Sequence, residues 1–524
     1  MEKEKLSKPA ILGKLLKNGI RIRESIEQEF SDPFDLQKHE LKKLLIIARE
    51  TQFGLKYQFK NNLREFKRNT SKHGFYDVFR QQVPIHNYNK IYNTWWYKTR
   101  AGQKDICWPG KIKYFALSSG TSEASSKYIP ISKNLIKSIQ RTSIRQILSL
   151  SKYKLPSSLF TKGILMLGGS THLNFNGNYF EGDLSGITAA QIPFWFQHFY
   201  KPGKKIAKIP DWNAKLEDIT LKAKKWDIGV IVGVPAWIQI LMEKIIHHYQ
   251  VDTIHDVWPN LEIYVHGGVS FDPYRKGFEK LLARPIRYIE TYLASEGFIA
   301  FQAVPDRKSM RLVLNNGLFY EFIPFDDKNF DDSGELKPDP ETYMIDQIKE
   351  NKEYALLLST CAGTWRYMIG DTVKVVNQEE SELVITGRTK HFLSLCGEHL
   401  SVDNMNKAIQ VVSDEMGIDV KEFAVAGIHY QSLFAHQWYI GTDSVIEPNV
   451  LKQKLDDNLK QLNDDYKVER FAALKEIMVE IVPTSLFYKW MKLQGKEGGQ
   501  NKFPRVLKKE KLQSWKEFLT QEMV

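Results

Sequence analysis

Cysteine is scarce in this sequence, and its distribution excludes two kinds of scaffold. Only three cysteines occur in 524 residues, Cys107, Cys361 and Cys396, and no two stand at the spacing of a zinc ligand pair. A disulfide framework needs more cysteines in a much shorter chain. We therefore expect three reduced, buried thiols.

Long hydrophobic runs are also missing. The longest, Ile228–Met242, is shorter than the ~20 apolar residues that span a bilayer, and Pro235 and Gln239 interrupt it. The N-terminus, MEKEKLSKPAILGKLLKNG, carries too many charges for a secretory signal. We therefore expect a cytoplasmic protein that does not bind membranes, and we expect a monomer.

Two catalytic signatures are absent as well. The sequence contains no Walker phosphate loop and no recognisable catalytic triad. It is basic, with 74 Lys and Arg, 62 Asp and Glu, and a net charge of +12. Because the basic residues are spread along the chain, nucleic-acid binding is not expected. The excess charge indicates a solvated lysine-rich surface, and it also favours anionic ligands such as nucleotides.

The length predicts at least two domains, because single cores rarely grow beyond about 250–300 residues. The first ~100 residues show helical spacing of apolar side chains. From Lys111 onward, short apolar strands alternate with amphipathic helices, which predicts an α/β domain with buried strands. The expected strands are Ile112–Leu117, Gly163–Leu167, Ile228–Val232, Leu261–Val265 and Ile286–Tyr292.

A more antiparallel subregion is expected after residue 310. Arg311–Leu314 and Leu318–Ile323 flank Asn316-Gly317, a dipeptide that favours a two-residue hairpin turn. Further strands are expected at residues 354–359, 372–376 and 382–385.

The last part of the chain mixes helices and strands, which predicts a compact α+β module. We therefore expect a large N-terminal domain, 1–386, and a smaller mobile C-terminal domain, 387–524, joined by a hinge near 386–390.

The segment YFALSSGTS carries the first chemical signal. An apolar strand leads into hydroxyl side chains around one glycine, which suits polyphosphate because glycine lets backbone N–H groups approach closely. The residues of this predicted loop are Ser118, Ser119, Gly120, Thr121 and Ser122.

Two further signals stand at the ends of predicted strands. In YVHGGVS, Gly267 and Gly268 would let a flat ring lie against bare backbone at the carboxyl edge of a sheet. In YIETYLASE, Glu296 could hold Mg²⁺, which prefers oxygen ligands and bridges phosphates.

Three more residues complete the set. Asp371, in TWRYMIGDTV, could accept both hydroxyls of a ribose. Arg388 stands at the predicted domain joint, where it could reach a nucleotide. Lys502, after the glycine-rich stretch GKEGGQ, could stabilise charge on an α-phosphate. Each segment alone is also compatible with an ordinary turn, a salt-bridged carboxylate or a surface cation.

In their order, these segments resemble the auxin-responsive acyl acid amido synthetases, the Gretchen Hagen family of the acyl-adenylate-forming superfamily. SSGTS resembles its phosphate loop, Tyr292-x-x-Ser295-Glu296 its Tyr-x-x-Ser-Glu motif, and RYMIGD its Arg-Tyr-x-x-Gly-Asp motif. Gly387-Arg388 resembles the hinge segment, and QNKFPR the C-terminal lysine motif. The third position of the second motif is Ala294, where plant members often carry serine.

The resemblance implies a role for each residue. Ser118, Ser119 and Thr121 would contact phosphate, Gly267 and Gly268 would flank adenine, Asp371 would bind the ribose, Arg388 the ribose or the hinge, and Glu296 would support Mg²⁺. Lys502 would approach the α-phosphate, so that Lys502 and Glu296 are the expected catalytic residues.

The expected function is ATP- and Mg²⁺-dependent adenylation of a carboxylic acid, followed by acyl transfer to an amine, with an amino acid as the expected acceptor. AMP and pyrophosphate would be released. Two alternatives are an acyl-CoA or acyl-carrier ligase and a non-catalytic nucleotide-binding protein. Candidate residues for the acid pocket are Thr188, Val234 and Trp237, together with Trp195, although each is also compatible with a place in the core.

Overall fold

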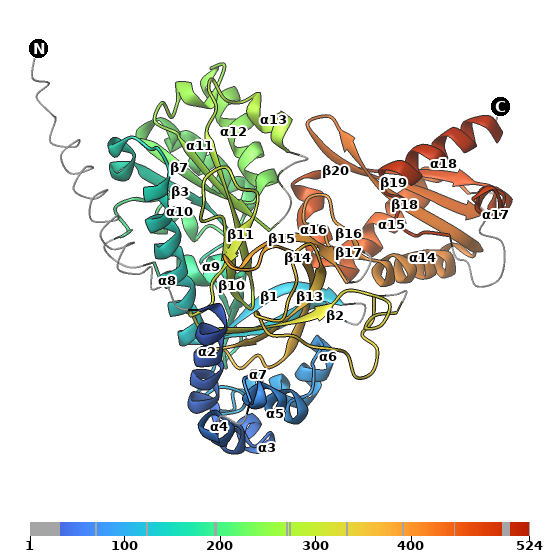
Figure 1. The fold of residues 1–524 in the computed structure, drawn as a ribbon. Coiled ribbons are helices and arrows are strands. Elements are labelled where there is room, and N and C mark those ends of the chain that lie inside the picture. The colour runs from blue at the N-terminus through green and yellow to red at the C-terminus, as the bar shows by residue number, and fades with distance from the viewer. Residues whose placement is uncertain are drawn as a thin grey trace, which may run out of the picture.

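The computed structural model describes residues 32–68, 71–121, 124–192, 196–268, 271, 274–331, 334–389, 392–444, 446–494 and 503–522; for residues 119–121, 124–126, 392 and 403 it describes the backbone alone. The first described elements are helices that pack at one end of the molecule (Figure 1). These are α2 (Pro33–Ala48), α3 (Gln52–Lys56), α4 (Phe59–Arg68), α5 (Gly74–Gln82), α6 (Tyr88–Ile91), the π-helix η1 (Tyr92–Trp96) and α7 (Tyr97–Arg100).

A sheet of eleven strands forms the centre of the large domain, in the order β12-β13-β14-β15-β11-β10-β9-β8-β7-β3-β6. The strands are β3 (Gly163–Leu167), β6 (Tyr200–Lys201), β7 (Ile228–Gly233), β8 (Ile263–Gly267), β9 (Arg287–Ala294), β10 (Gly297–Phe301), β11 (Met310–Leu312), β12 (Leu318–Pro324), β13 (Glu353–Thr360), β14 (Tyr367–Asn377) and β15 (Glu382–Arg388).

The two halves of this sheet differ in strand direction. β9, β8, β7, β3 and β6 are parallel neighbours, whereas all pairs from β9 through β10 to β12 are antiparallel. Parallel strands need crossover connections, and helices supply several of them. The described helices here are α8 (Lys133–Ser149), α9 (Leu184–Ala189), α10 (Lys204–Ala207), α11 (Trp212–Lys222), α12 (Pro235–Tyr249) and α13 (Arg275–Glu279). The predicted α/β domain with an antiparallel subregion is confirmed.

A second, smaller sheet has the order β2-β1-β5-β4. Its strands are β1 (Tyr114–Thr121), β2 (Ala124–Ile131), β4 (Asn174–Phe175) and β5 (Phe180–Gly182). β1 continues through four of the five residues predicted as a loop, because Ser118, Ser119 and Thr121 pair with Lys127, Ser126 and Ala124 of β2. The hydroxyl-rich segment is therefore the end of a β-hairpin.

The C-terminal module is α+β, as predicted. Its sheet pairs β18 (Val420–Tyr430) antiparallel with β19 (Leu433–Thr442), which is parallel to β20 (Leu474–Val482). A small hairpin, β16 (Phe392–Leu393) and β17 (Leu400–Ser401), precedes it. The helices are α14 (Val402–Met416), α15 (Pro448–Leu462), α16 (Asp464–Phe471), α17 (Thr484–Leu493) and α18 (Lys509–Glu522).

The C-terminal module lies against the large domain on the side of the β1–β2 hairpin (Figure 1). α16 contacts β1, and α15 contacts β2. Tyr274 packs edge-on against Phe434 at 5.0 Å, and one apolar cluster runs from β3, β7 and β8 into β18, β19 and β20. The two parts of the chain thus share a continuous core.

The predicted hairpin at Asn316-Gly317 is wrong. β11 pairs with β10 and β15, while β12 pairs with β13, so the two strands that flank the dipeptide are not neighbours. The buried Asn316 amide instead donates to the Ser138 carbonyl at 2.6 Å and to the Thr142 hydroxyl. These contacts to α8 outweigh the local preference for a two-residue turn.

Among the helices of the described ranges, none is both long and apolar enough to cross a membrane.

Candidate active site

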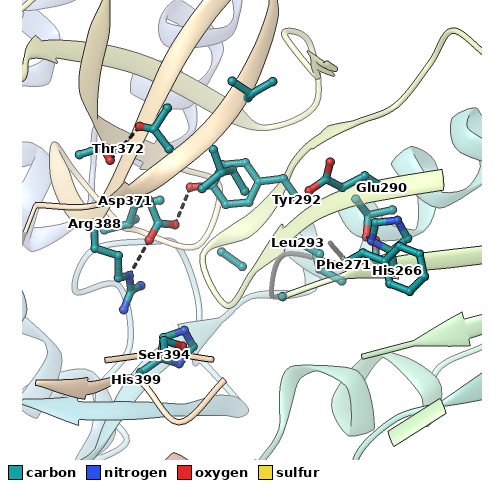
Figure 2. Close-up of a pocket in the computed structure, with 18 of the residues that line it drawn as sticks. His266, Phe271, Glu290, Tyr292, Leu293, Asp371, Thr372, Arg388, Ser394 and His399 are labelled. Atoms are coloured by element: carbon teal, nitrogen blue, oxygen red, sulfur yellow. Dashed lines mark hydrogen bonds and ion pairs between the residues drawn. The ribbon is translucent and has the colours of Figure 1, made fainter. Parts of the chain in front are cut away.

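An open cleft of about 1310 Å³ lies where the large domain, the β1–β2 hairpin and the C-terminal module meet. Figure 2 shows part of its lining. The residues singled out from the sequence that line the cleft include Ser118, Gly268, Tyr292, Ser295, Glu296, Asp371 and Arg388. Five of the six segments that carry the motifs therefore converge in space, although they are far apart in the chain.

Asp371 lies at the centre of a hydrogen-bonded set. The Tyr292 hydroxyl donates to its Oδ2 at 2.5 Å, and the Arg388 Nε donates to its Oδ1 at 2.8 Å (Figure 2). Burial raises the pKa of Tyr292 well above its ordinary value, so the phenol keeps the proton that it donates. Each oxygen of Asp371 retains a second lone pair, and the carboxylate can still accept ribose hydroxyls.

Glu296 is buried where β9 turns into β10, close to two cations. Burial raises the pKa of this carboxyl, while the charges of Lys127 and Arg388 lower it and that of Asp371 raises it. A buried carboxylate close to cations can help to hold a divalent cation and the phosphates that it bridges.

The β1–β2 hairpin brings a lysine to the predicted phosphate segment. Ser118 of β1 is the register partner of Lys127 of β2, and both line the cleft. The backbones of Ser119, Gly120 and Thr121 continue β1 to its end, whereas Ser122 lies outside the described residues.

Gly267 and Gly268 follow each other at the carboxyl end of β8, and each has its own reason to be glycine. A Cβ on Gly267 would stand 2.4 Å from the Thr291 carbonyl oxygen, which would force β8 and β9 apart. Gly268 has φ +84°, a conformation that side chains disfavour. Both glycines therefore shape the cleft edge independently of any ligand.

The three candidates for the acid pocket lie in different surroundings. Thr188 donates its hydroxyl to the Leu184 carbonyl within α9 at 2.9 Å. Trp237 packs edge-on against Trp212 at 4.2 Å. Val234 precedes α12 and lies beside Gly268. In the part of the chain that the structure describes, none of the three lines the cleft. Their role as acid-binding residues stays a prediction, and Trp195 lies outside the described residues.

Lys502 also lies outside the described residues, and its role stays a prediction. Its neighbour in the motif, Arg505, donates from Nη1 to the Glu422 carboxylate at 2.6 Å and stacks on Phe423 at 4.3 Å. Arg505 thus anchors the end of that segment to β18.

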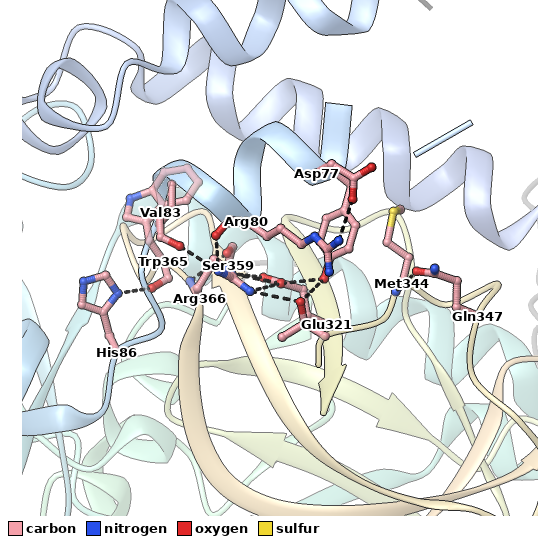
Figure 3. A network of polar contacts seen from close by, with 12 residues as sticks. Asp77, Arg80, Val83, His86, Glu321, Met344, Gln347, Ser359, Trp365 and Arg366 are labelled. Carbon is pink, nitrogen blue, oxygen red and sulfur yellow. Dashed lines mark hydrogen bonds and ion pairs between the residues drawn. The ribbon is translucent and has the colours of Figure 1, made fainter. Parts of the chain in front are cut away.

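Arg366, the first residue of the RYMIGD motif, lies away from the cleft in a buried polar network (Figure 3). Its Nε donates to both oxygens of the buried Glu321 at 3.0 and 3.1 Å, and its Nη1 donates to the Arg80 and Val83 carbonyls. The guanidinium of Arg366 thus bonds to Glu321 of β12 and to the carbonyls of Arg80 and Val83 at the end of α5. Arg366 therefore fastens the N-terminal helices to the sheet.

The cleft residues that sequence reasoning missed include four charged or titratable side chains near the predicted site: Lys127, His399, Asp465 and Lys508. For Lys127 a signal existed, because a lysine on the return strand of a Ser/Thr/Gly hairpin points to phosphate. The others are brought to the cleft by packing of the C-terminal module, which no local pattern indicates.

The chemistry of the lining fits Mg²⁺ bound together with phosphate. Among the described residues no group of three or more His, Cys, Asp or Glu could hold a metal. Mg²⁺ commonly takes one or two carboxylates and completes its shell with substrate phosphates and water. Glu296 can supply such a carboxylate.

Comparison with known proteins gives matches in the same regions. The chain is 27% identical over 173 residues to the jasmonoyl–L-amino acid synthetase GH3.5 of Oryza sativa subsp. japonica, an alignment of 30% of this chain and 28% of that protein. The chain thus matches less than a third of this curated relative's length.

Two solved structures share the fold over most of the chain. One, the GH3.15 acyl acid amido synthetase, has a TM-score of 0.56 at 14% identity and covers 94% of this chain and 95% of its own. The other, a 2-hydroxyisobutyryl-CoA ligase in its thioesterification state, has a TM-score of 0.57 at 10% identity and covers 93% and 92%.

Three family models match in order along the sequence. They describe the GH3 family N-terminal domain at residues 22–221, its central domain at 311–388 and its C-terminal domain at 403–511. With all three domains present in sequence order on the fold of a GH3 enzyme, this chain belongs to the GH3 family.

Proposed function

We propose that this chain is an ATP- and Mg²⁺-dependent ligase that adenylates a carboxylic acid and transfers the acyl group to the amine of an amino acid. The observation that carries the proposal is the meeting of Asp371, Arg388 and Glu296 in one large cleft beside the phosphate hairpin. The family and the names of its relatives, which are amido synthetases, support the second step.

In this proposal the nucleotide lies with its ribose on Asp371. Tyr292 and Arg388 hold the carboxylate in place, so that little side-chain entropy remains to be lost on binding. The phosphates extend toward Ser118 and Lys127, and Lys127 offsets part of their charge.

Adenylation makes the acid a usable acyl donor. A carboxylate oxygen of the acid attacks the α-phosphorus, and the bond to the bridging oxygen breaks, so that pyrophosphate leaves. Glu296 would hold Mg²⁺ together with phosphate, and the ion would supply charge withdrawal from the phosphate oxygens. The cations Lys127 and Arg388 stabilise the charge that develops, and Lys502 remains our candidate for the α-phosphate.

Acyl transfer needs no covalent intermediate on the protein. The amine attacks the acyl carbonyl carbon, and AMP leaves with the electron pair of the broken C–O bond. We also propose that the protein acts in the cytoplasm on small molecules, without nucleic acid, and as a monomer.

The test is acid-dependent exchange of radioactive pyrophosphate into ATP across a panel of carboxylic acids, followed by mass spectrometry with amino acids present. Exchange followed by an ATP-dependent amide is the expected result. If exchange occurs but the only acyl product is a thioester formed when CoA is added, the acceptor is a thiol and not an amine. If the protein showed no exchange and bound no nucleotide in calorimetry, the proposal that it is an enzyme would be wrong.

A further inference from the structure

A histidine and an aspartate of the C-terminal module form a pair at the cleft. His399 Nδ1 lies 3.0 Å from Asp465 Oδ2, and both side chains line the cleft. Because a carboxylate accepts the Nδ1 proton, it fixes the tautomer in which the other ring nitrogen, Nε2, can accept a proton. None of the motifs that predicted the nucleotide site contains Asp465.

The backbone at His399 is held in an uncommon conformation. Its φ is 38°, in the left-handed region that non-glycine residues rarely adopt. The side-chain amide of Asn463, the N-cap of α16, donates to the His399 carbonyl at 3.1 Å. Residues held in such regions cluster at functional sites, where the surrounding structure offsets the cost.

The preceding residue, Glu398, makes the loop rigid. It is fully buried and accepts hydrogen bonds from the backbone N–H groups of Leu395 and Cys396, and it lies 2.9 Å from His436 Nε2. These partners hold the pKa of Glu398 at about 2 despite its burial. The loop from residue 394 to residue 399 is thus a fixed platform that presents His399 to the cleft.

The position of the pair suits a role in acyl transfer to the amine, the second step of the proposed reaction. Figure 2 shows Ser394 and His399 in the cleft that holds Asp371 and Arg388, and α16, which carries Asp465, contacts β1 of the phosphate hairpin. The pair therefore reaches the cleft from the C-terminal module, whereas Asp371 and Arg388 reach it from β14 and β15 of the large sheet.

We infer that His399 is the base that takes a proton from the acceptor amine during acyl transfer, and that Asp465 is its positioning residue. The inference rests on the proposed ligase function and adds the residue that serves its acceptor. An amino acid enters mostly as an ammonium ion and gives one proton to water. As its nitrogen lone pair bonds to the acyl carbon, the nitrogen gives its second proton to Nε2, the C–O bond to the phosphate breaks, and AMP leaves with that electron pair.

Several charged groups surround the pair. Asp465 lies on α16, and Asp183, which precedes α9, is near enough for the Asp465 charge to add to the effect of burial in raising its pKa. The cations that line the same cleft include Arg388 from β15 and Lys508 before α18. The imidazole thus has a carboxylate as its hydrogen-bond partner, and cations line the same cleft.

The decisive variant is His399→Asn. Asparagine tolerates the left-handed backbone, so the loop is kept, but its amide cannot accept the proton at neutral pH. Amide formation with an amino acid should fall by about 10²- to 10⁴-fold, the usual contribution of a general base. Acid-dependent pyrophosphate exchange, and trapping of the adenylate by the largely uncharged nucleophile hydroxylamine, should persist.

Asp465→Asn gives a readout that a structural role would not produce. Without the carboxylate nothing holds the Nδ1 proton, so the kcat of amide formation should fall, while the KM for ATP and the rate of pyrophosphate exchange stay unchanged. His247→Asn, at an exposed position of α12 outside the cleft lining, is the matched control and should leave both half-reactions unchanged.

Two results would overturn the inference: amide formation by His399→Asn at the wild-type rate, or a parallel loss of exchange and amide formation. Failure of the proposed function looks different, since the wild-type protein would then show no exchange with any acid.

Discussion

Asp371 and Arg388 face each other as register partners in β14 and β15, and the guanidinium Nε donates to the carboxylate at 2.8 Å. Arg388 is the last residue of the large sheet. The carboxylate proposed to hold the ribose is therefore tied to the strand end that leads into the C-terminal module. A change in the path of the chain after Arg388 would therefore change the position of the Asp371 carboxylate that is proposed to bind the ribose.

Asp371→Asn should weaken ATP binding more than it changes the fold. The variant keeps the shape of the side chain but loses the charge that balances Arg388, and hydrogen bonds to charged groups contribute about 1.5–3 kcal/mol each. We expect a 10- to 100-fold rise in the KM for ATP in pyrophosphate exchange, roughly as that energy predicts. Asp414→Asn, at an exposed position of α14, is the control. An unchanged KM would exclude Asp371 from the ribose site.

Glu296→Gln should make the protein inactive in exchange yet more stable at neutral pH. Burial raises the pKa of Glu296 above its ordinary value of 4.5. The folded state therefore binds more protons than the unfolded state between those two pKa values, and stability falls as pH rises through that window. Glutamine carries no charge and avoids this loss.

The melting temperatures of wild type and Glu296→Gln, measured from about pH 4 to about pH 8, check this expectation. The two melting temperatures should agree at the acidic end of the range. Above pH 4.5 the melting temperature of the variant should become the higher of the two. Equal melting temperatures over the whole range would show that the carboxylate is not destabilising.

Glu321→Gln should destabilise the fold without touching the cleft. It leaves the buried guanidinium of Arg366 without its counter-charge, and breaking such a pair typically costs about 3–5 kcal/mol. Urea unfolding should show that loss, while the KM for ATP of the protein that remains folded stays the same. Glu379→Gln, at an exposed position, should have little effect on either. A rise in the KM would mean that this network reaches the nucleotide site.

Removal of divalent cations should abolish exchange and leave the melting temperature of the free protein unchanged. Within the described ranges no cluster of side chains forms a metal cage, so the cation should arrive with the nucleotide. Exchange and thermal melts with and without EDTA measure both effects. A large fall in melting temperature would reveal a structural metal instead.

Much of the site could be predicted because its residues follow strands. Asp371 and Arg388 lie in β14 and β15, and Glu296 lies in the short turn between β9 and β10, so correct strand positions place all three on the large sheet. The α/β order and the α+β module followed from apolar periodicity for the same reason.

The rest depends on contacts between distant parts of the chain. Asn316-Gly317 has the local signature of a hairpin, yet the contacts of Asn316 to α8 decide its structure. His399 and Asp465 are 66 positions apart and meet only after β17, α14 and α15 have packed. Arg366 belongs to a motif of the cleft but serves the fold, and only its buried partners reveal that.

The apolar cluster that runs from β3 to β20 makes the two modules one cooperative unit in this arrangement. Their interface cannot separate without exposing part of that core to water, and the associated heat-capacity change would be visible in calorimetry. Separation of the modules and partial melting would then share the same energetic origin, so that conditions which weaken hydrophobic association would favour both.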